Sequence, residues 1–217
     1  SKFGVKVTLT DLSNIENLKK HLTDKTKVVY FETPCNPTLK LLDIELIAKT
    51  AHAFNPEIRV IVDNTFCTPY LQRPLELGAD VVVHSGTKYL SGHNDTVCGF
   101  LCSGNQELAD RFRLLSKTTG ATLGPFESWL CLRGLKTLAL RMERHKSNAE
   151  AVSRWLREQS VVTNVYYAGS GMISFTVTSS EIAVAILKNI RLITFAESLG
   201  GTESLLTYPA VQTHPDV

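Results

Sequence analysis

Three segments of the chain place polar side chains directly after runs of apolar residues. The segments are residues 32–37 (ETPCNP), 63–65 (DNT) and 84–89 (HSGTKY), and the apolar runs lie just before them. Such runs are typical of buried strands. In open α/β sheets, ligands bind beyond the carboxyl ends of the strands. We therefore expect the three segments to meet at one edge of a sheet and to form a binding site.

Lys88 carries the most reactive group in these segments. On a glycine-containing turn after a buried strand, a lysine is partly desolvated, which favours the neutral amine that can form a Schiff base. The hydroxyl groups of Ser85 and Thr87 are suited to a phosphate. Asp63 ends an apolar strand, where a protonated ring nitrogen would compensate its charge. A lysine Schiff base and an acidic partner for a pyridinium nitrogen are together typical of a pyridoxal phosphate (PLP) enzyme.

Other interpretations of these residues stay open. Lys88 could be an ordinary surface lysine, and Asp63 could cap a helix or a turn. A nicotinamide site is disfavoured, because no G-x-G-x-x-G follows any of the strands.

The elements that would position these residues alternate along the chain. Strands are predicted at Val28–Phe31, Arg59–Asp63, Asp80–His84 and Val97–Cys102, and a helix is predicted at Asp43–Phe54, with its first residue as N-cap. Apolar strands separated by helices indicate a sheet covered on both faces, so the fold class is α/β.

The second part of the chain has a different pattern. A long helix is predicted over Glu127–Glu158, with a bend at Gly134. Strands at 162–167 and 172–177 and a helix at 179–190 follow it. We expect a large domain over residues 1–150 and the start of a smaller α+β domain over residues 151–217.

Composition limits the classes of partner. The chain has 217 residues, of which 43% are apolar and 20% charged, with a net charge of +2. This balance gives no support for a nucleic-acid partner. The apolar runs are far shorter than the ~20 residues that cross a bilayer, so no membrane partner is expected. The five cysteines fit no common zinc signature. We expect reduced thiols, a cytoplasmic protein and no metal site.

The three segments together resemble the Cys/Met-metabolism family of PLP-dependent enzymes, which includes cystathionine γ-synthases, cystathionine γ- and β-lyases and methionine γ-lyases. The resemblance extends in order along nearly the whole chain. It continues through residues 133–138 (RGLKTL), 171–175 (GMISF) and 196–205 (AESLGGTESL).

The resemblance implies a role for each matching residue. Lys88 matches the lysine that holds PLP as an aldimine, and Asp63 matches the partner of the pyridine nitrogen. Ser85 and Thr87 match the hydroxyl groups that bind the phosphate. Asn36 matches an asparagine that lies near both the cofactor and the substrate carboxylate.

Two further positions match the substrate loop of the family. Ser198 matches a residue that positions the substrate carboxylate and the lysine, and Glu197 matches a position that varies among members. The resemblance implies the aspartate-aminotransferase fold, a small amino-acid substrate and a homotetramer whose active sites are shared between subunits.

The segment 195–198 (FAES) favours chemistry at the γ-carbon of cystathionine or of an activated homoserine. A cystathionine β-lyase or a methionine γ-lyase is the alternative within the family. An inactive PLP-binding or scaffold relative is the alternative of another class.

The chain departs from the family in two ways. Members are considerably longer, so we expect the chain to be incomplete at both ends. The connection at residues 167–172 (YAGSGM) is also shorter than in many members.

Overall fold

A four-stranded sheet forms the centre of the first part of the molecule. The computed structural model describes residues 3–213. The strands lie in the order β1 (Val28–Glu32), β2 (Arg59–Asp63), β3 (Val81–Ser85) and β4 (Gly99–Cys102). The first three are parallel and β4 is antiparallel. Residues Glu32, Asp63 and Ser85 therefore end their strands at the same edge, as the sequence predicts.

Short helices connect these strands and cover one face of the sheet. Helix α1 (Ile15–His21) lies beside α2 (Ile44–Phe54), which begins at the predicted N-cap, Asp43. Leu18, Phe31, Ile47 and Val62 belong to the apolar core between these helices and the sheet. The other connections are α3 (Thr68–Leu71), η1 (Pro74–Leu77) and η2 (Gly86–Leu90).

The prediction of a sheet covered on both faces is wrong for β1 in the described part of the chain. Burial alternates along this strand. Val28 and Tyr30 are 49% and 57% exposed, whereas Val29 and Phe31 are buried. Alternation of this kind marks a strand with one open face. The sequence hides it, because apolar residues occupy both faces.

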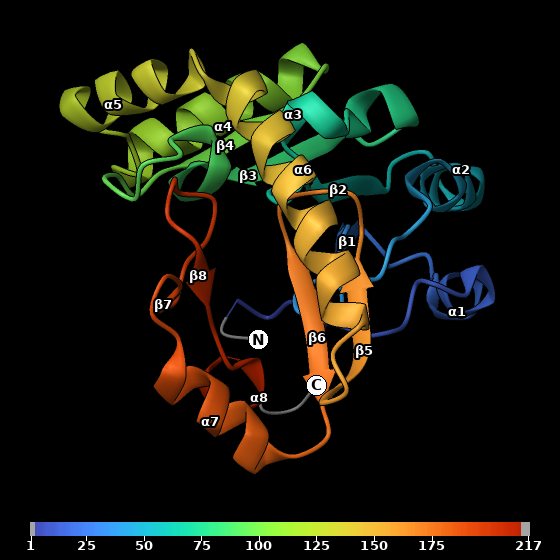
Figure 1. Cartoon of the computed structure of the whole chain (residues 1–217). Helices are drawn as coiled ribbons and strands as arrows, with labels where there is room; N and C mark the ends of the chain where they lie inside the picture. The colour runs from blue at the N-terminus through green and yellow to red at the C-terminus, as the bar shows by residue number, and fades with distance from the viewer. Residues whose placement is uncertain (1–2, 214–217) are drawn as a thin grey trace.

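The single long helix predicted at 127–158 is two helices. They are α5 (Pro125–Leu135) and α6 (Leu138–Arg157), separated at Lys136–Thr137. Before them lies α4 (Gln106–Thr119), which the sequence analysis did not identify. In Figure 1, α4 and α5 lie above the sheet, and α6 runs down from them beside β5 and β6.

The last part of the chain contains two small sheets. Strands β5 (Val162–Tyr167) and β6 (Ile173–Val177) form an antiparallel hairpin, and residues 168–172 are its short connecting loop. Then follow α7 (Ser180–Asn189), the parallel pair β7 (Thr194–Phe195) and β8 (Leu205–Leu206), and α8 (Pro209–Gln212).

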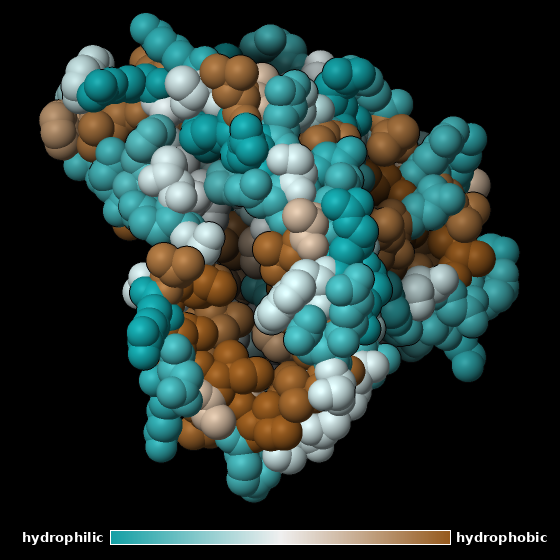
Figure 2. All heavy atoms as spheres, viewed as in Figure 1, coloured by the Kyte–Doolittle hydropathy of each residue, from teal (hydrophilic) through white to brown (hydrophobic). Residues whose placement is uncertain are grey.

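Apolar side chains gather at the lower left of the view in Figure 2, over the region of α7, β7 and β8. No helix of residues 3–213 is both long and apolar enough to span a membrane.

The division into two domains at residue 150 stays a prediction. Helix α6 runs through that point without a break, and residues 214–217 of the predicted second domain lie outside the described part.

Candidate active site

Asp63 and Ser85 are joined at the sheet edge by Thr65. The Thr65 backbone N–H donates a hydrogen bond to Asp63 Oδ1 (3.0 Å), and Ser85 N–H donates to Thr65 Oγ1 (2.9 Å). The Tyr30 hydroxyl, on the open face of β1, lies 3.5 Å from Asp63 Oδ2. Thr65 belongs to the segment 63–65 that the sequence places at the site, and a residue two positions after an aspartate can close a local turn on it. Tyr30 was not predicted from the sequence.

Lys88 lies in the turn η2, which directly follows β3. Its backbone is non-helical (φ −89°, ψ −125°), so the turn is kinked at this residue. Lys88 Nζ donates a hydrogen bond to Ser198 Oγ at 2.9 Å. Burial lowers the pKa of the Lys88 ammonium below its ordinary value, and the Glu197 carboxylate opposes this shift. The predicted residues Lys88, Glu197 and Ser198 are therefore brought together across 110 positions of sequence.

A glycine lets the loop of Ser198 approach Lys88 this closely. At Gly200 the backbone has a φ of +83°, and a Cβ atom there would lie 2.5 Å from Tyr89 N and 2.7 Å from Lys88 C. Ser198 itself has a φ of +84°. The loop can keep this position only while residue 200 has no side chain.

Thr87 lies at the site, but its hydroxyl group is already engaged. Thr87 Oγ1 accepts a hydrogen bond from Cys98 N–H (3.0 Å) and donates one to Cys98 O (3.3 Å). Ser85 Oγ has no protein hydrogen bond within residues 3–213 and is free to donate. Of the two predicted phosphate ligands, Ser85 is therefore the better placed to serve in the conformation seen.

Asn36 lies just beyond the end of β1, at the same sheet edge. Its backbone N–H donates to Glu32 Oε1 at 2.6 Å, and its side chain is exposed. No contact between that side chain and Lys88 or Asp63 is present among the described residues. The structure thus places Asn36 near the site without joining it to the other members.

A cavity of about 990 Å³ lies beside Ser198. It is formed where the β7–β8 segment meets the loops below α5, on the left of Figure 1. Thr87, Glu197 and Ser198 line it, and Asp95 and Glu127 add two more carboxylates. Lys88 reaches Ser198 from outside the lining. The cavity can therefore accept the distal part of a ligand whose reacting end lies at Lys88.

His84 is a buried imidazole close to the sheet edge. It is 6% exposed, and its Nδ1 atom has no hydrogen-bond partner within residues 3–213. Burial lowers the pKa of His84, against the opposing effect of Asp63. Burial therefore disfavours the charged form of this imidazole, and the nearby Asp63 carboxylate favours it.

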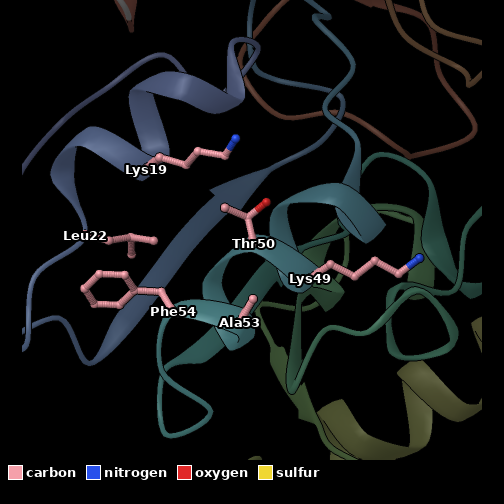
Figure 3. Close-up of a pocket in the computed structure, with 6 residues that line it drawn as sticks. All are labelled: Lys19, Leu22, Lys49, Thr50, Ala53 and Phe54. Atoms are coloured by element: carbon pink, nitrogen blue, oxygen red, sulfur yellow. The ribbon is translucent and has the colours of Figure 1, made fainter.

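A second cavity, of about 400 Å³, lies between α1 and α2. Figure 3 shows the Leu22 and Phe54 side chains together at one end of it. Its two lysines, Lys19 and Lys49, are already paired with Glu16 and Glu45. Because it contains none of the predicted site residues, we assign it no part in the chemistry.

Comparison with known proteins gives a consistent family. The model of the Cys/Met metabolism PLP-dependent enzymes matches residues 1–217. A cystathionine gamma-synthase of Haemophilus influenzae is 48% identical over 215 residues, which are 99% of this chain and 58% of that protein. A cystathionine beta-lyase of Lactococcus lactis subsp. cremoris is 45% identical over 234 aligned positions, covering 100% of this chain and 61% of that protein.

The fold agrees with a solved structure of the same kind. The crystal structure of cystathionine gamma-lyase from Lactobacillus plantarum, complexed with L-serine, superposes with a TM-score of 0.95 at 38% identity. The match covers 99% of this chain and 60% of that one. The chain thus spans about three fifths of the length of the proteins that it matches.

Proposed function

Since the chain belongs to the Cys/Met metabolism PLP-dependent enzyme family, we propose that it carries the reactive lysine of a transsulfuration enzyme, with Lys88 as that lysine. One observation carries the proposal. A half-buried amine, with its pKa lowered by burial, lies at the carboxyl edge of the three parallel strands and donates to Ser198 Oγ at 2.9 Å. This is the position where an open α/β sheet binds its ligand.

The residues at the edge fit PLP. Ser85 Oγ is a free donor for the phosphate, and Asp63 Oδ2 has only the long contact with Tyr30 in the described part, so it can accept from a ring N–H. Lys88 Nζ is the expected attachment point, and Asn36 and Thr87 would complete the set. When bound, the cofactor supplies an electron sink for the substrate carbanion.

The side chains of this chain would divide the remaining work among themselves. Asp63 would keep a proton on the ring nitrogen, since its charge at the end of an apolar strand stabilises a cation. Lys88 Nζ, once released, would take the proton from the substrate Cα. Ser198 Oγ would hold Nζ in line for that transfer, and its loop would bind the substrate carboxylate.

We propose γ-carbon chemistry, on cystathionine or an activated homoserine. Glu197 lines the cavity beside Ser198, where a carboxylate can accept from the distal ammonium of such a substrate or product. The cystathionine gamma-synthase of Haemophilus influenzae, 48% identical over 215 residues, is consistent with this choice.

We also propose a cytoplasmic homotetramer. Exposed apolar side chains on α5 support an interface between copies: Phe126 stacks on Trp129, and Arg133 lies over the Trp129 ring. Trp129 is 54% exposed. Sedimentation velocity would give the assembly mass.

The role of Lys88 is tested by Lys88→Ala. We expect loss of turnover with some remaining PLP binding through the phosphate contacts. Borohydride treatment of the wild type should fix the cofactor on the peptide that contains Lys88, as seen by mass spectrometry. Lys117→Ala, an exposed lysine on α4, is the matched control. Normal turnover by Lys88→Ala would exclude the proposed function.

The choice of reaction is tested at Glu197. A site built around a polar contact discriminates against ligands that leave it unpaired. We therefore expect Glu197→Val to lower kcat/KM for cystathionine, or for its formation, more than for methionine. Glu197→Gln, which keeps the hydrogen-bonding capacity, should lose less. An unchanged ratio between the two substrates would show that Glu197 does not select the substrate.

A further inference from the structure

Arg141, on α6, donates hydrogen bonds to the backbone carbonyl groups of the residues that follow Lys88. Its Nη1 donates to Tyr89 O at 2.7 Å, and its Nη2 lies 3.5 Å from Leu90 O. The same Nη2 donates to Gly134 O at 2.9 Å, and Nε donates to Thr137 Oγ1 at 3.1 Å. One guanidinium group therefore links the turn of Lys88 to the end of α5 and the start of α6.

The kink at Lys88 explains why these carbonyl groups need a side-chain donor. Across the kink, Ser91 N–H bonds to Gly86 O and Gly92 N–H bonds to Lys88 O. Tyr89 O and Leu90 O, which follow these acceptors in the chain, receive their hydrogen bonds in residues 3–213 from Arg141. Without Arg141, both carbonyl groups would lose a donor beside a buried core, and an unsatisfied buried carbonyl group destabilises the turn.

The setting of Arg141 suits a fixed donor better than an ion-pairing group. The described residues contain no salt bridge of Arg141. Burial lowers the pKa of its guanidinium, and Cys131 opposes that effect. A planar guanidinium has five N–H donors in fixed directions on three nitrogens, so it can reach three carbonyl groups and the Thr137 hydroxyl at once, whereas the three donors of a lysine ammonium all lie on one atom.

We propose that Arg141 is a positioning residue that fixes the turn 86–90, and thereby aims Lys88 Nζ at Ser198 and the reacting atoms. Two elements hold the Lys88 backbone from different directions. The Gly200 loop lies against Lys88 C and Tyr89 N, and Arg141 holds the carbonyl groups of Tyr89 and Leu90. The inference rests on the proposed function of Lys88.

The first test measures the Lys88 amine in the cofactor-free protein. Competitive acetylation with acetic anhydride over a range of pH, followed by mass spectrometry of the Lys88 peptide, gives the pKa of Nζ. In Arg141→Gln the turn is loosened and Nζ gains water, so its pKa should rise toward that of an ordinary lysine. Arg144→Gln removes the same charge from an exposed position on the same helix and should leave the pKa of Nζ unchanged.

The second test uses the PLP-loaded enzyme. Since a displacement of about 1 Å can cost on the order of 100-fold in rate, we expect Arg141→Gln to lower kcat by about 10- to 100-fold. The KM should change much less, because Arg141 does not line the substrate cavity. Arg141→Lys should recover only part of the loss, since it restores the charge but not the fork.

The outcomes separate positioning from a merely structural role. If Arg141→Gln lowers the melting temperature but changes neither the pKa of Nζ nor kcat, the proposal is overturned. If it does not fold, Thr137→Val decides, because it removes the hydrogen bond from Nε and the one that Thr137 Oγ1 donates to Gly134 O, and leaves the guanidinium itself in place. In Thr137→Val, a rise in the pKa of Nζ that is smaller than the one expected for Arg141→Gln supports the proposal. An unchanged pKa in Thr137→Val overturns it. Failure of the proposed function would appear separately, as turnover by Lys88→Ala.

Discussion

Replacing Gly200 by alanine tests whether the loop of Ser198 is held against the backbone of Lys88. The left-handed backbone at Gly200 costs alanine about 1–2 kcal/mol. The new Cβ atom would also overlap Tyr89 N and Lys88 C, which are backbone atoms and cannot swing aside. Such overpacking adds about 1–3 kcal/mol. We expect Gly200→Ala to lower the free energy of unfolding by about 2–5 kcal/mol.

Alanine variants of two other glycines separate the cost of the left-handed backbone from the cost of the steric overlap at Gly200. Gly120 has a φ of +76° with nothing within 4 Å of its Cβ position, so Gly120→Ala should lose only about 1–2 kcal/mol. Gly104 has neither constraint, and Gly104→Ala should change stability by under about 0.5 kcal/mol. Urea unfolding of the three variants gives the order. Equal losses for Gly200→Ala and Gly120→Ala would refute the close contact of the loop with Lys88.

Three more outcomes are expected from the site. Asp63→Asn should lower turnover by about three decades, which is roughly 4 kcal/mol of barrier, and Asp63→Glu should lower it by less. Steady-state rates would measure both losses. Full activity in Asp63→Asn would show that this carboxylate is purely structural. Ser198→Ala should reduce kcat by up to about tenfold, the worth of one hydrogen bond, and no change would leave Ser198 without a role in holding Nζ. Burial lowers the pKa values of His84 and His145, and Asp63 opposes the shift at His84 while Arg141 adds to that at His145. The unfolded chain thus binds more protons just below the ordinary histidine pKa of about 6.5, so stability should fall as the pH drops through that range and level off below the folded pKa values. The slope of the urea midpoint against pH would show this effect, and His145→Gln should make that slope smaller. A urea midpoint that does not change with pH would contradict the expected loss of stability.

Much of the sheet could be predicted, because its signal is local. Strand β2 has the predicted bounds, Arg59–Asp63, since an apolar run with a polar stop is readable in one short window. The break in the long helix was placed at Gly134 and lies two residues later. Gly134 is helical and buried, and the chain turns at Lys136–Thr137. Local sequence does not reveal that shift, nor that Gly134 lies against the backbone of Ser91, where a Cβ atom would not fit.

Some residues of the candidate site could likewise be predicted from local sequence, and others could not. Lys88, Asp63 and Ser85 follow strands and could be found from their positions alone. The contact of Lys88 with Ser198 joins parts of the chain too distant for any spacing rule, and family resemblance was needed to pair them. The sequence does not reveal the partners of Tyr30 and Arg141. Tyr30 contacts a carboxylate on another strand, and Arg141 bonds to three backbone carbonyl groups and a hydroxyl group.

The hydrogen bond between Lys88 and Ser198 also bears on the order of events during synthesis. Ribosomes deliver the N-terminal part first, and Lys88 emerges 110 residues before Ser198. Until the later segment docks, the lysine amine lies in water, where it is protonated at neutral pH and a poor nucleophile. The surroundings that lower the pKa of the Lys88 amine are therefore complete only when the segment that bears Ser198 has folded onto it.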